Sequence, residues 1–452
     1  MAKKDKNRAA VRRAVKGHGF LTPAYSASVR RFIICVGGFY LRFVEGVSRV
    51  SFIHEERLID AMRGFNRGEH RLIFVFRHAA KEDPPVLMYS FSKLLRRKIE
   101  RYGGLSHLRF LYGRDVPNWA GKISAWLFPR IGAIPVQNRA GNREALSILH
   151  REAASGRFPI ALAPEEQVVY HMYRTFSIAP GTSSLVKWGL ESGKPVMVVP
   201  LALGYTYGAA PEAFIRDKLA EWEGLTGQAL ENRESAPLHK LLCAAVDGTL
   251  SLLEPEYNLP EPVSADRLKP EVLDKRITAL CESLLCSAEK AAGLLSEGSN
   301  MDRLFRIRYA GTDSFYPEHP DPETLPRMKR ALLDFNALKA EVFIRHERIY
   351  DVLEYIHMDY ISPPFSAGRG CEFILNLIDL VFRTLGGTIS SHKTPSGQHA
   401  AVLAGEPLIY TKETQASLSR REFLASISSD IKTAFETVSE ELEVQWEKVK
   451  LQ

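Results

Sequence analysis

Residues 71–85 read RLIFVFRHAAKEDPP, and this stretch decides the fold expected of the chain. The apolar run 72–76 is short, is followed at once by charged residues, and has two prolines shortly beyond, which is typical of a buried strand that ends near His78. In an open α/β sheet, a side chain at the carboxyl end of a strand points into the crevice where ligands bind. His78 is therefore the first candidate for a functional residue.

Four similar apolar runs follow and alternate with stretches of helical pattern. The runs cover residues 109–112, 133–136, 159–163 and 196–203, and the helical stretches cover 86–102, 121–128, 142–155 and 182–192. This alternation predicts an α/β fold with a largely parallel sheet and helices on its faces.

Strand-like runs become rare after about residue 210. Proline-rich breaks fall at 254–270 and 316–326, and amphipathic helical patterns cover 325–356 and 422–449. We therefore expect three regions: a basic arm and helix over 1–65, an α/β domain over 66–250, and a mostly helical region over 251–452. The last region has no recognisable motif, and clamping of the α/β domain, partner binding and shaping of a groove remain open for it.

Composition indicates a globular protein with a basic excess. The 452 residues are 45% hydrophobic and 25% charged, and the formal net charge is +7. Such a charge suits nucleic acid, an anionic membrane or a phosphorylated substrate. No base–aromatic interleaving, helix-turn-helix or zinc signature is present, so nucleic acid is not expected as a partner. Five scattered cysteines without a Cys-x-x-Cys pair favour a reducing, cytosolic setting and no metal site.

Residues 32–65 have a helical pattern, and their most apolar part, 32–44, reads FIICVGGFYLRFV. A bilayer span needs roughly 20 apolar residues, so this stretch is too short to cross a membrane. Two interpretations remain: an amphipathic helix that lies on a membrane surface with help from nearby basic residues, or an ordinary first helix packed in the core.

A carboxylate follows His78 at a spacing of five, at Asp83. Histidine is the side chain best able to take a proton near neutral pH, and a carboxylate can hold its ring in one tautomer. The spacing alone is weak, because His346 and Asp351 repeat it. That second pair lies in a helical pattern, where five steps of about 100° separate the side chains by roughly 140°, so we expect plain surface-helix residues there.

Two later segments carry candidate binding residues. In GAIPVQNRAGNREAL (132–146), Arg139 and Arg143 are placed to bind a phosphate, unless they are solvated surface arginines. In IALAPEE (160–166), Glu165 is placed to accept hydrogen bonds from substrate hydroxyls, although a lone Pro-Glu after a strand is a weak signal. A buried strand over 196–203, broken by Pro200, completes the series.

In this order the segments resemble the glycerol-phosphate acyltransferase superfamily, the lysophosphatidic acid acyltransferase type in particular. His78 and Asp83 match its His-x-x-x-x-Asp block, and 132–136 with the following arginine match its phosphate-binding block. Pro164–Glu165 matches its Phe-Pro-Glu-Gly block, and Val199–Pro200 its last, apolar block. The resemblance covers about residues 70–205.

The resemblance implies an acyltransferase in phospholipid biosynthesis, with 66–250 as catalytic domain and His78 as general base assisted by Asp83. The acyl donor would be a thioester of coenzyme A or acyl carrier protein, and no cofactor or metal is implied. The acceptor would be a lysophosphatidate, glycerol phosphate or related lysolipid, and the location the cytoplasmic face of a membrane, peripheral or monotopic. The substrate-binding residues implied are Gly132, Asn138, Arg139, Arg143 and Glu165.

Three departures from the family pattern concern the acceptor site. Arg77 stands where Asn or Ser usually precedes the histidine, and Asn138 stands where the phosphate-binding arginine is usual, with Arg139 one place later. Residues 166–168 replace the usual Gly, Thr and Arg, which predicts the loss of a tight turn and of one cationic contact. A second function class therefore stays open: a lipid-binding membrane-surface protein on the same fold that has lost catalysis.

Overall fold

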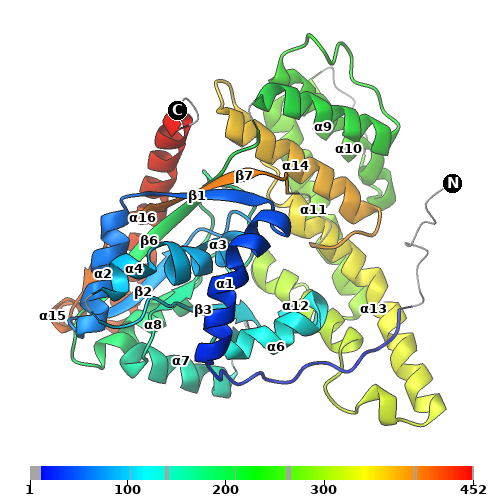
Figure 1. Cartoon of the computed structure of the whole chain (residues 1–452). Helices are drawn as coiled ribbons and strands as arrows, with labels where there is room; N and C mark the ends of the chain where they lie inside the picture. Colours follow the sequence, from blue (N-terminus) through cyan, green and yellow to red (C-terminus); the bar gives the residue numbers. More distant parts are fainter. Residues whose placement is uncertain are drawn as a thin grey trace.

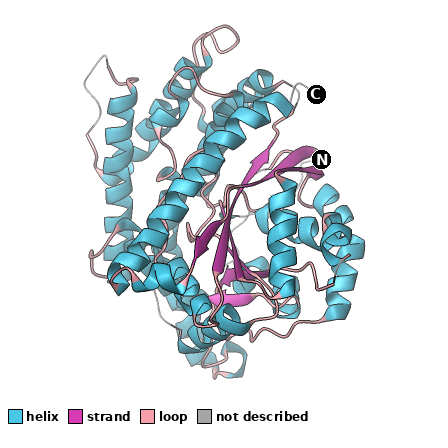
Figure 2. Cartoon of the chain, turned by 90° about the vertical axis from the view of Figure 1, so that its left-hand side faces the viewer, coloured by secondary structure: helices cyan, strands magenta, loops and turns pink. Residues whose placement is uncertain are grey.

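One mixed sheet of eight strands organises the described part of the chain (Figures 1 and 2). The structure, a computed structural model, describes residues 12–101, 103–137, 142–208, 210–260, 266–389, 392 and 394–449. The strands are β1 (Val47–Ile53), β2 (Arg71–Phe76), β3 (Arg109–Gly113), β4 (Ile134–Val136), β5 (Ile160–Leu162), β6 (Val196–Tyr205), β7 (Gln398–Ala404) and β8 (Leu408–Tyr410). Their order is β1-β7-β6-β2-β5-β3-β4, and β8 pairs with β6.

The five strands expected from the apolar runs are confirmed, and they pair in parallel as β6-β2-β5-β3-β4. β2 lies inside the sheet, where Val75 is opposite Leu162 of β5 and Pro200 of β6. Residues 72–76 are all buried, as a continuous apolar run predicts for a strand that is covered on both faces.

The prediction of helix throughout 32–65 is wrong for the stretch that forms β1. β1 pairs in parallel with β7, from Val47 opposite Gln398 to Ile53 opposite Leu403. β7 in turn runs antiparallel to β6. Most of β1 is only partly buried and its Arg49 is exposed, so it lacks the apolar run that identified the inner strands.

Pro200 does not break β6, contrary to expectation. Its carbonyl accepts a hydrogen bond from Gly405 N at 2.8 Å, so its nitrogen faces the same side. On that side β8 pairs with 196–198 and β7 with 201–205. The proline lies in the gap between these two partners, where no ladder hydrogen bond is lost.

Helices lie on both sides of the sheet (Figure 2). In chain order, the helices before β6 are α1 (Ala27–Phe43), α2 (Glu55–Arg67), α3 (Asp83–Tyr89), α4 (Arg96–Glu100), α5 (Val116–Ala120), α6 (Lys122–Arg130), α7 (Arg143–Ser155) and α8 (Gly181–Leu190). The helices after β6 are α9 (Pro211–Thr226), α10 (Leu238–Leu253), α11 (Pro270–Ala292), α12 (Asn300–Phe315), α13 (Arg327–Leu353), α14 (Ala367–Thr384), α15 (Lys412–Ala416) and α16 (Arg420–Val449). A π-helical turn, Ser90–Leu94, joins α3 to α4.

The region after 250 is mostly helical, as expected, but it also completes the sheet. β7 lies between β1 and β6, and α16 packs against β6. The sheet therefore takes strands from both sides of the predicted boundaries at 66 and 250. None of the described helices has both the length and the apolar character needed to cross a bilayer.

Candidate active site

His78 lies just beyond the carboxyl end of β2, as predicted. β5 is the parallel neighbour of β2, and it brings Glu165 to the same edge of the sheet. The imidazole of His78 is 18% exposed, whereas the carboxylate of Asp83 is fully buried. The loop 77–82 folds back so that Asp83, the first residue of α3, meets the histidine.

The two side chains form a dyad in which His78 Nδ1 lies 3.1 Å from Asp83 Oδ2. The same oxygen accepts a hydrogen bond of 2.8 Å from Ala80 N. A carboxylate in this position favours the tautomer with the proton on Nδ1, which leaves Nε2 as the nitrogen able to take a proton.

Tyr205, at the end of β6, completes the support of the dyad. Its hydroxyl donates a hydrogen bond of 2.5 Å to Asp83 Oδ1, and its side chain is buried. Burial, followed by the nearby carboxylates, raises the pKa of Tyr205 well above its usual value, so the phenol keeps its proton. Sequence reasoning missed this residue, which lies two places beyond the expected strand end.

Glu165 lies behind the dyad and not at its open side. Its Oε2 accepts from His78 N at 3.1 Å, and its Oε1 accepts from Arg77 Nε at 3.1 Å and from Phe176 N at 3.3 Å. The Arg77 and Glu165 side chains are both fully buried. Both oxygens are thus occupied, which differs from the expected contact with substrate hydroxyls: in this structure Glu165 positions the backbone that carries His78.

Arg77, which stands where the acyltransferase pattern would have Asn or Ser, has several buried partners. Besides Glu165, its guanidinium donates to Ser439 Oγ at 2.6 Å and to His171 O at 3.1 Å. It thereby links the strand end, the loop after β5 and α16. No local sequence pattern reveals such a role, because Ser439 lies 362 positions away.

The tight turn expected to be lost at residue 166 is present. Glu166 has a φ of 68°, in the left-handed region that favours glycine, and its amide donates to Ala163 O. The prediction that replacement of the family's glycine removes the turn is therefore wrong. The surrounding loop holds a glutamate in the conformation instead.

Of the remaining predicted binding residues, the structure describes Gly132 and Arg143. Gly132 precedes β4 with a φ of 77°, and Arg143 is exposed at the first position of α7. Within the described ranges, no hydrogen bond or ion pair joins either of them to His78, Asp83 or Glu165. Asn138 and Arg139 lie outside the described residues.

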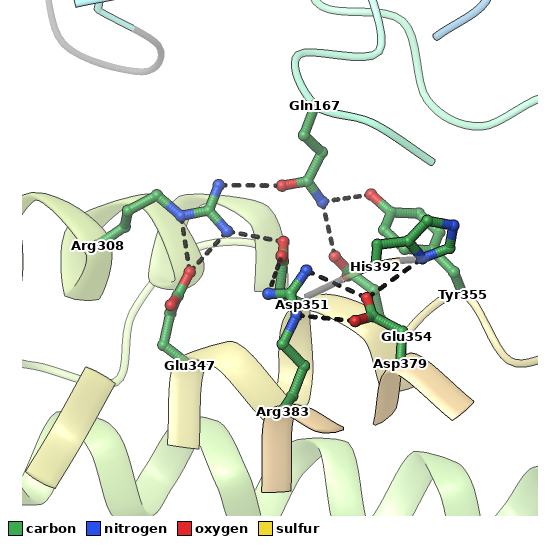
Figure 3. A network of polar contacts seen from close by, with 9 residues as sticks. All are labelled: Gln167, Arg308, Glu347, Asp351, Glu354, Tyr355, Asp379, Arg383 and His392. Carbon is green, nitrogen blue, oxygen red and sulfur yellow. Dashed lines mark hydrogen bonds and ion pairs between the residues drawn. The ribbon is translucent and has the colours of Figure 1, made fainter. Parts of the chain in front are cut away.

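A partly buried polar network braces the loop after β5 against the C-terminal helices (Figure 3). Gln167 Nε2 donates to Glu354 Oε1 at 2.9 Å, and Arg308 Nη1 donates to Gln167 Oε1 at 3.2 Å. Arg308 and Arg383 both bind Asp351, at 2.7 and 3.2 Å. The network connects the loop that follows Pro164–Glu165 to α12, α13 and α14.

The expectation for the second His–Asp pair is wrong in part. His346 and Asp351 lie on α13, but Asp351 is buried between two arginines and is not a surface residue. His346 is partly buried and its Nδ1 lies 2.7 Å from the hydroxyl of Tyr257. The pattern of one helix could not reveal the neighbours that bury its aspartate.

A narrow pocket lies beside the dyad loop, lined in part by Ala79, Glu82, Tyr205 and Glu372. Burial raises the pKa of Glu82, and it raises that of Glu372 to about 8. At neutral pH Glu372 is therefore mainly protonated, and it contributes a neutral group to the pocket wall.

The arrangement has the chemistry of a general base with a fixed orienting carboxylate. If a substrate hydroxyl approaches Nε2 of His78, that hydroxyl is the nucleophile, and the protein does not need to supply one. No group of three or more His, Cys, Asp or Glu side chains among the described residues could hold a metal ion.

Neither a family model nor a curated protein matches the chain.

Proposed function

We propose that this protein is an acyltransferase that moves a fatty acyl group from an acyl thioester to the hydroxyl of a lipid precursor. The donor is an acyl group on coenzyme A or acyl carrier protein. The acceptor is a lysophosphatidate, a glycerol phosphate or a related lysolipid. His78 acts as general base and Asp83 orients it.

One observation carries the proposal: the partly exposed imidazole of His78 is bonded to a fully buried carboxylate at the carboxyl end of an inner parallel strand. His150 and Glu191 approach to 2.7 Å, but both are about half exposed on the surface. Only in the first pair does the protein fix both the carboxylate and the backbone of the histidine.

In the proposed reaction, Nε2 of His78 removes the proton of the acceptor hydroxyl while its oxygen attacks the thioester carbonyl carbon. Asp83 stabilises the imidazolium that forms. Collapse of the tetrahedral intermediate breaks the C–S bond, and the imidazolium returns its proton to the leaving thiolate. Backbone amides near the strand ends are candidates for stabilising the oxyanion. General-base assistance of this kind contributes roughly 10²–10⁴-fold in rate.

The proposal also includes a site for the polar head of the acceptor. Arg143, exposed at the start of α7, together with Gly132, Asn138 and Arg139, remains the proposed site for a phosphate. A lipid acceptor resides in a membrane, and the protein must reach it there. A peripheral position at the cytoplasmic face of a membrane is therefore part of the proposal.

The test is turnover of purified full-length protein with a labelled acyl thioester and a panel of acceptors, resolved by thin-layer chromatography. We expect His78→Ala to lower kcat at least about 100-fold, because the general base is lost. The control is His150→Ala, which removes a surface histidine of the same kind and should leave kcat unchanged. Wild-type turnover by His78→Ala would refute the assignment. Complete inactivity of the wild type with every acceptor would favour a lipid-binding protein without catalysis.

A further inference from the structure

α6 packs on the protein through Phe128, which lies against the ring of Tyr112, but it leaves other apolar side chains exposed. Its sequence is KISAWLFPR, and none of its residues is buried. Ile123 is 78% exposed and Trp126 46%, and Trp119 on the preceding α5 is 43% exposed. Exposed apolar side chains gathered on one element, and not scattered singly, mark an interaction site.

α1 exposes a second apolar stripe. Its inner side packs through buried residues that include Ile34 and Leu41. Its outer side carries Phe32, Phe39 and Phe43, which are 58%, 67% and 66% exposed. A helix that is apolar on both sides needs a second partner for its outer side.

The two stripes belong to neighbouring elements. Ala24 N donates to Pro129 O and Ser26 N donates to Arg130 O, both at 2.8 Å, so the start of α1 is tied to the end of α6. The two helices also contact each other, as Figure 1 shows. α1 also packs against α3, the helix that begins at Asp83.

Basic side chains predominate on this surface, and two acidic residues lie at its margins: Asp115, which accepts a hydrogen bond from Trp119 Nε1 at 3.1 Å, and Glu45, which accepts one from the Tyr40 hydroxyl. Neither α1 nor the stretch 116–130 contains an acidic residue. Arg31, Arg42 and Lys122 are exposed on them, whereas Arg30 is buried in an ion pair with Glu100 at 2.6 Å.

We infer that α1 and α5–α6 form one docking surface for an anionic lipid bilayer, on which both helices lie without crossing it. The outer phenylalanines and Ile123 enter the acyl boundary, and the two tryptophans lie at the headgroup level, where amphipathic aromatic rings are favoured. The exposed arginines and lysine face the anionic headgroups. The membrane position itself belongs to the proposed function, on which this inference rests; the inference adds which surface of the protein meets the bilayer, and that surface would serve a membrane-bound protein of any activity.

The test is co-sedimentation of full-length protein with vesicles of phosphatidylcholine alone and of phosphatidylcholine mixed with phosphatidylglycerol. We expect binding to the mixed vesicles that weakens with salt. Ile123→Ser and Phe39→Ser should each lower the partition coefficient on the order of tenfold, as expected for loss of one buried apolar side chain. Leu295→Ser is the matched control, because Leu295 is 68% exposed on the loop between α11 and α12 and belongs to none of the helices of the proposed surface. Its binding should equal that of the wild type.

Three outcomes would overturn the inference. Equal binding of wild type and Ile123→Ser would mean that α1 docks alone. Equal binding of all variants would mean that the surface does not meet lipid. A dimer in light scattering that Ile123→Ser converts to a monomer, with vesicle binding unchanged, would assign the surface to a second copy of the chain. Because no acyl donor is present in these assays, a failure of the proposed reaction would not affect the result.

Discussion

Asp83 orients His78 because Asp83 is itself fixed on three sides. Its two oxygens bind the histidine ring, a backbone amide and the Tyr205 hydroxyl. If one of these donors is removed, the buried carboxylate loses a hydrogen bond, while the free-energy cost of removing it from water remains. Tyr205 is therefore a positioning residue for the proposed reaction.

The first prediction is that Tyr205→Phe lowers both stability and turnover. Loss of the hydroxyl leaves Asp83 Oδ1 without its donor, which costs about 1–3 kcal/mol of unfolding free energy in urea titrations. We expect kcat to fall with KM nearly unchanged, because the hydroxyl touches the dyad's carboxylate and not the substrate.

The control is Tyr410→Phe. Tyr410 is also buried, lies on another strand next to β6, and donates to Asp430 Oδ2 at 3.0 Å. It should lose stability while kcat stays at the wild-type value. If both variants retained wild-type kcat, Tyr205 would be a purely structural residue.

Glu372 gives a second prediction, which concerns pH. Burial raises its pKa from an ordinary 4.5 to about 8 in the folded protein. Between these values the folded protein keeps the proton and the unfolded chain releases it. Unfolding therefore becomes more favourable as the pH rises through this window, and Glu372 contributes a loss of stability there.

Glu372→Gln mimics the protonated acid and should remove that contribution. Urea titrations from about pH 5 to 8 should give a flatter pH dependence for the variant than for the wild type. Glu436→Gln, an exposed change on α16, is the control and should follow the wild-type curve. Parallel curves for Glu372→Gln and wild type would contradict the assignment.

At the scale of elements, the loop between β5 and α8 is held by helices distant in sequence. Gln167 reaches Glu354, which caps the end of α13, and Met172 N donates to Glu372 of α14 at 2.8 Å. Glu165 and Phe176, which support the dyad, belong to this loop. The position of the dyad therefore depends on the C-terminal helices.

The third prediction is that Gln167→Ala loosens this loop. The change leaves Glu354 and Arg308 without hydrogen bonds that they make in the protein. We expect a loss of about 1–3 kcal/mol in unfolding free energy and faster amide hydrogen exchange over residues 164–178. Gln445→Ala, which removes a 2.7 Å bond within α16, should leave exchange in the loop unchanged. Protection equal to the wild type would show that the network does not brace the loop.

At the scale of the molecule, the four sequence blocks do not delimit a folding unit. The fragment 66–250 contains them all, but it lacks β1, β7 and α16. β8 also lies outside the fragment, so β6 loses both of its antiparallel partners, and the buried Arg77 loses its bond to Ser439.

The fourth prediction is that this fragment does not fold cooperatively. Near-ultraviolet circular dichroism and urea unfolding should show no native packing and no sharp transition, whereas the full chain should show both. A cooperative unfolding transition of the fragment would show that the sheet folds without β1, β7 and α16, contrary to this prediction.

The sequence by itself determined the inner part of the fold. Runs such as 72–76 and 196–203 form strands that are covered on both faces, and their short length and the polar, Gly and Pro residues that bound them distinguish them from helices. It also placed His78 and Asp83 at a strand end, and the structure brings them to 3.1 Å.

Only the tertiary structure decided which distant side chains surround the dyad. Tyr205, Arg77 with Ser439, and the buried Asp351 depend on neighbours more than 30 positions away along the chain. β1 and β7 escaped prediction for the same reason: β1 is only partly buried, and its pairing with β7 spans some 350 positions. Periodicity reports how a segment meets an apolar surface, but it carries no information about which polar partner arrives from elsewhere.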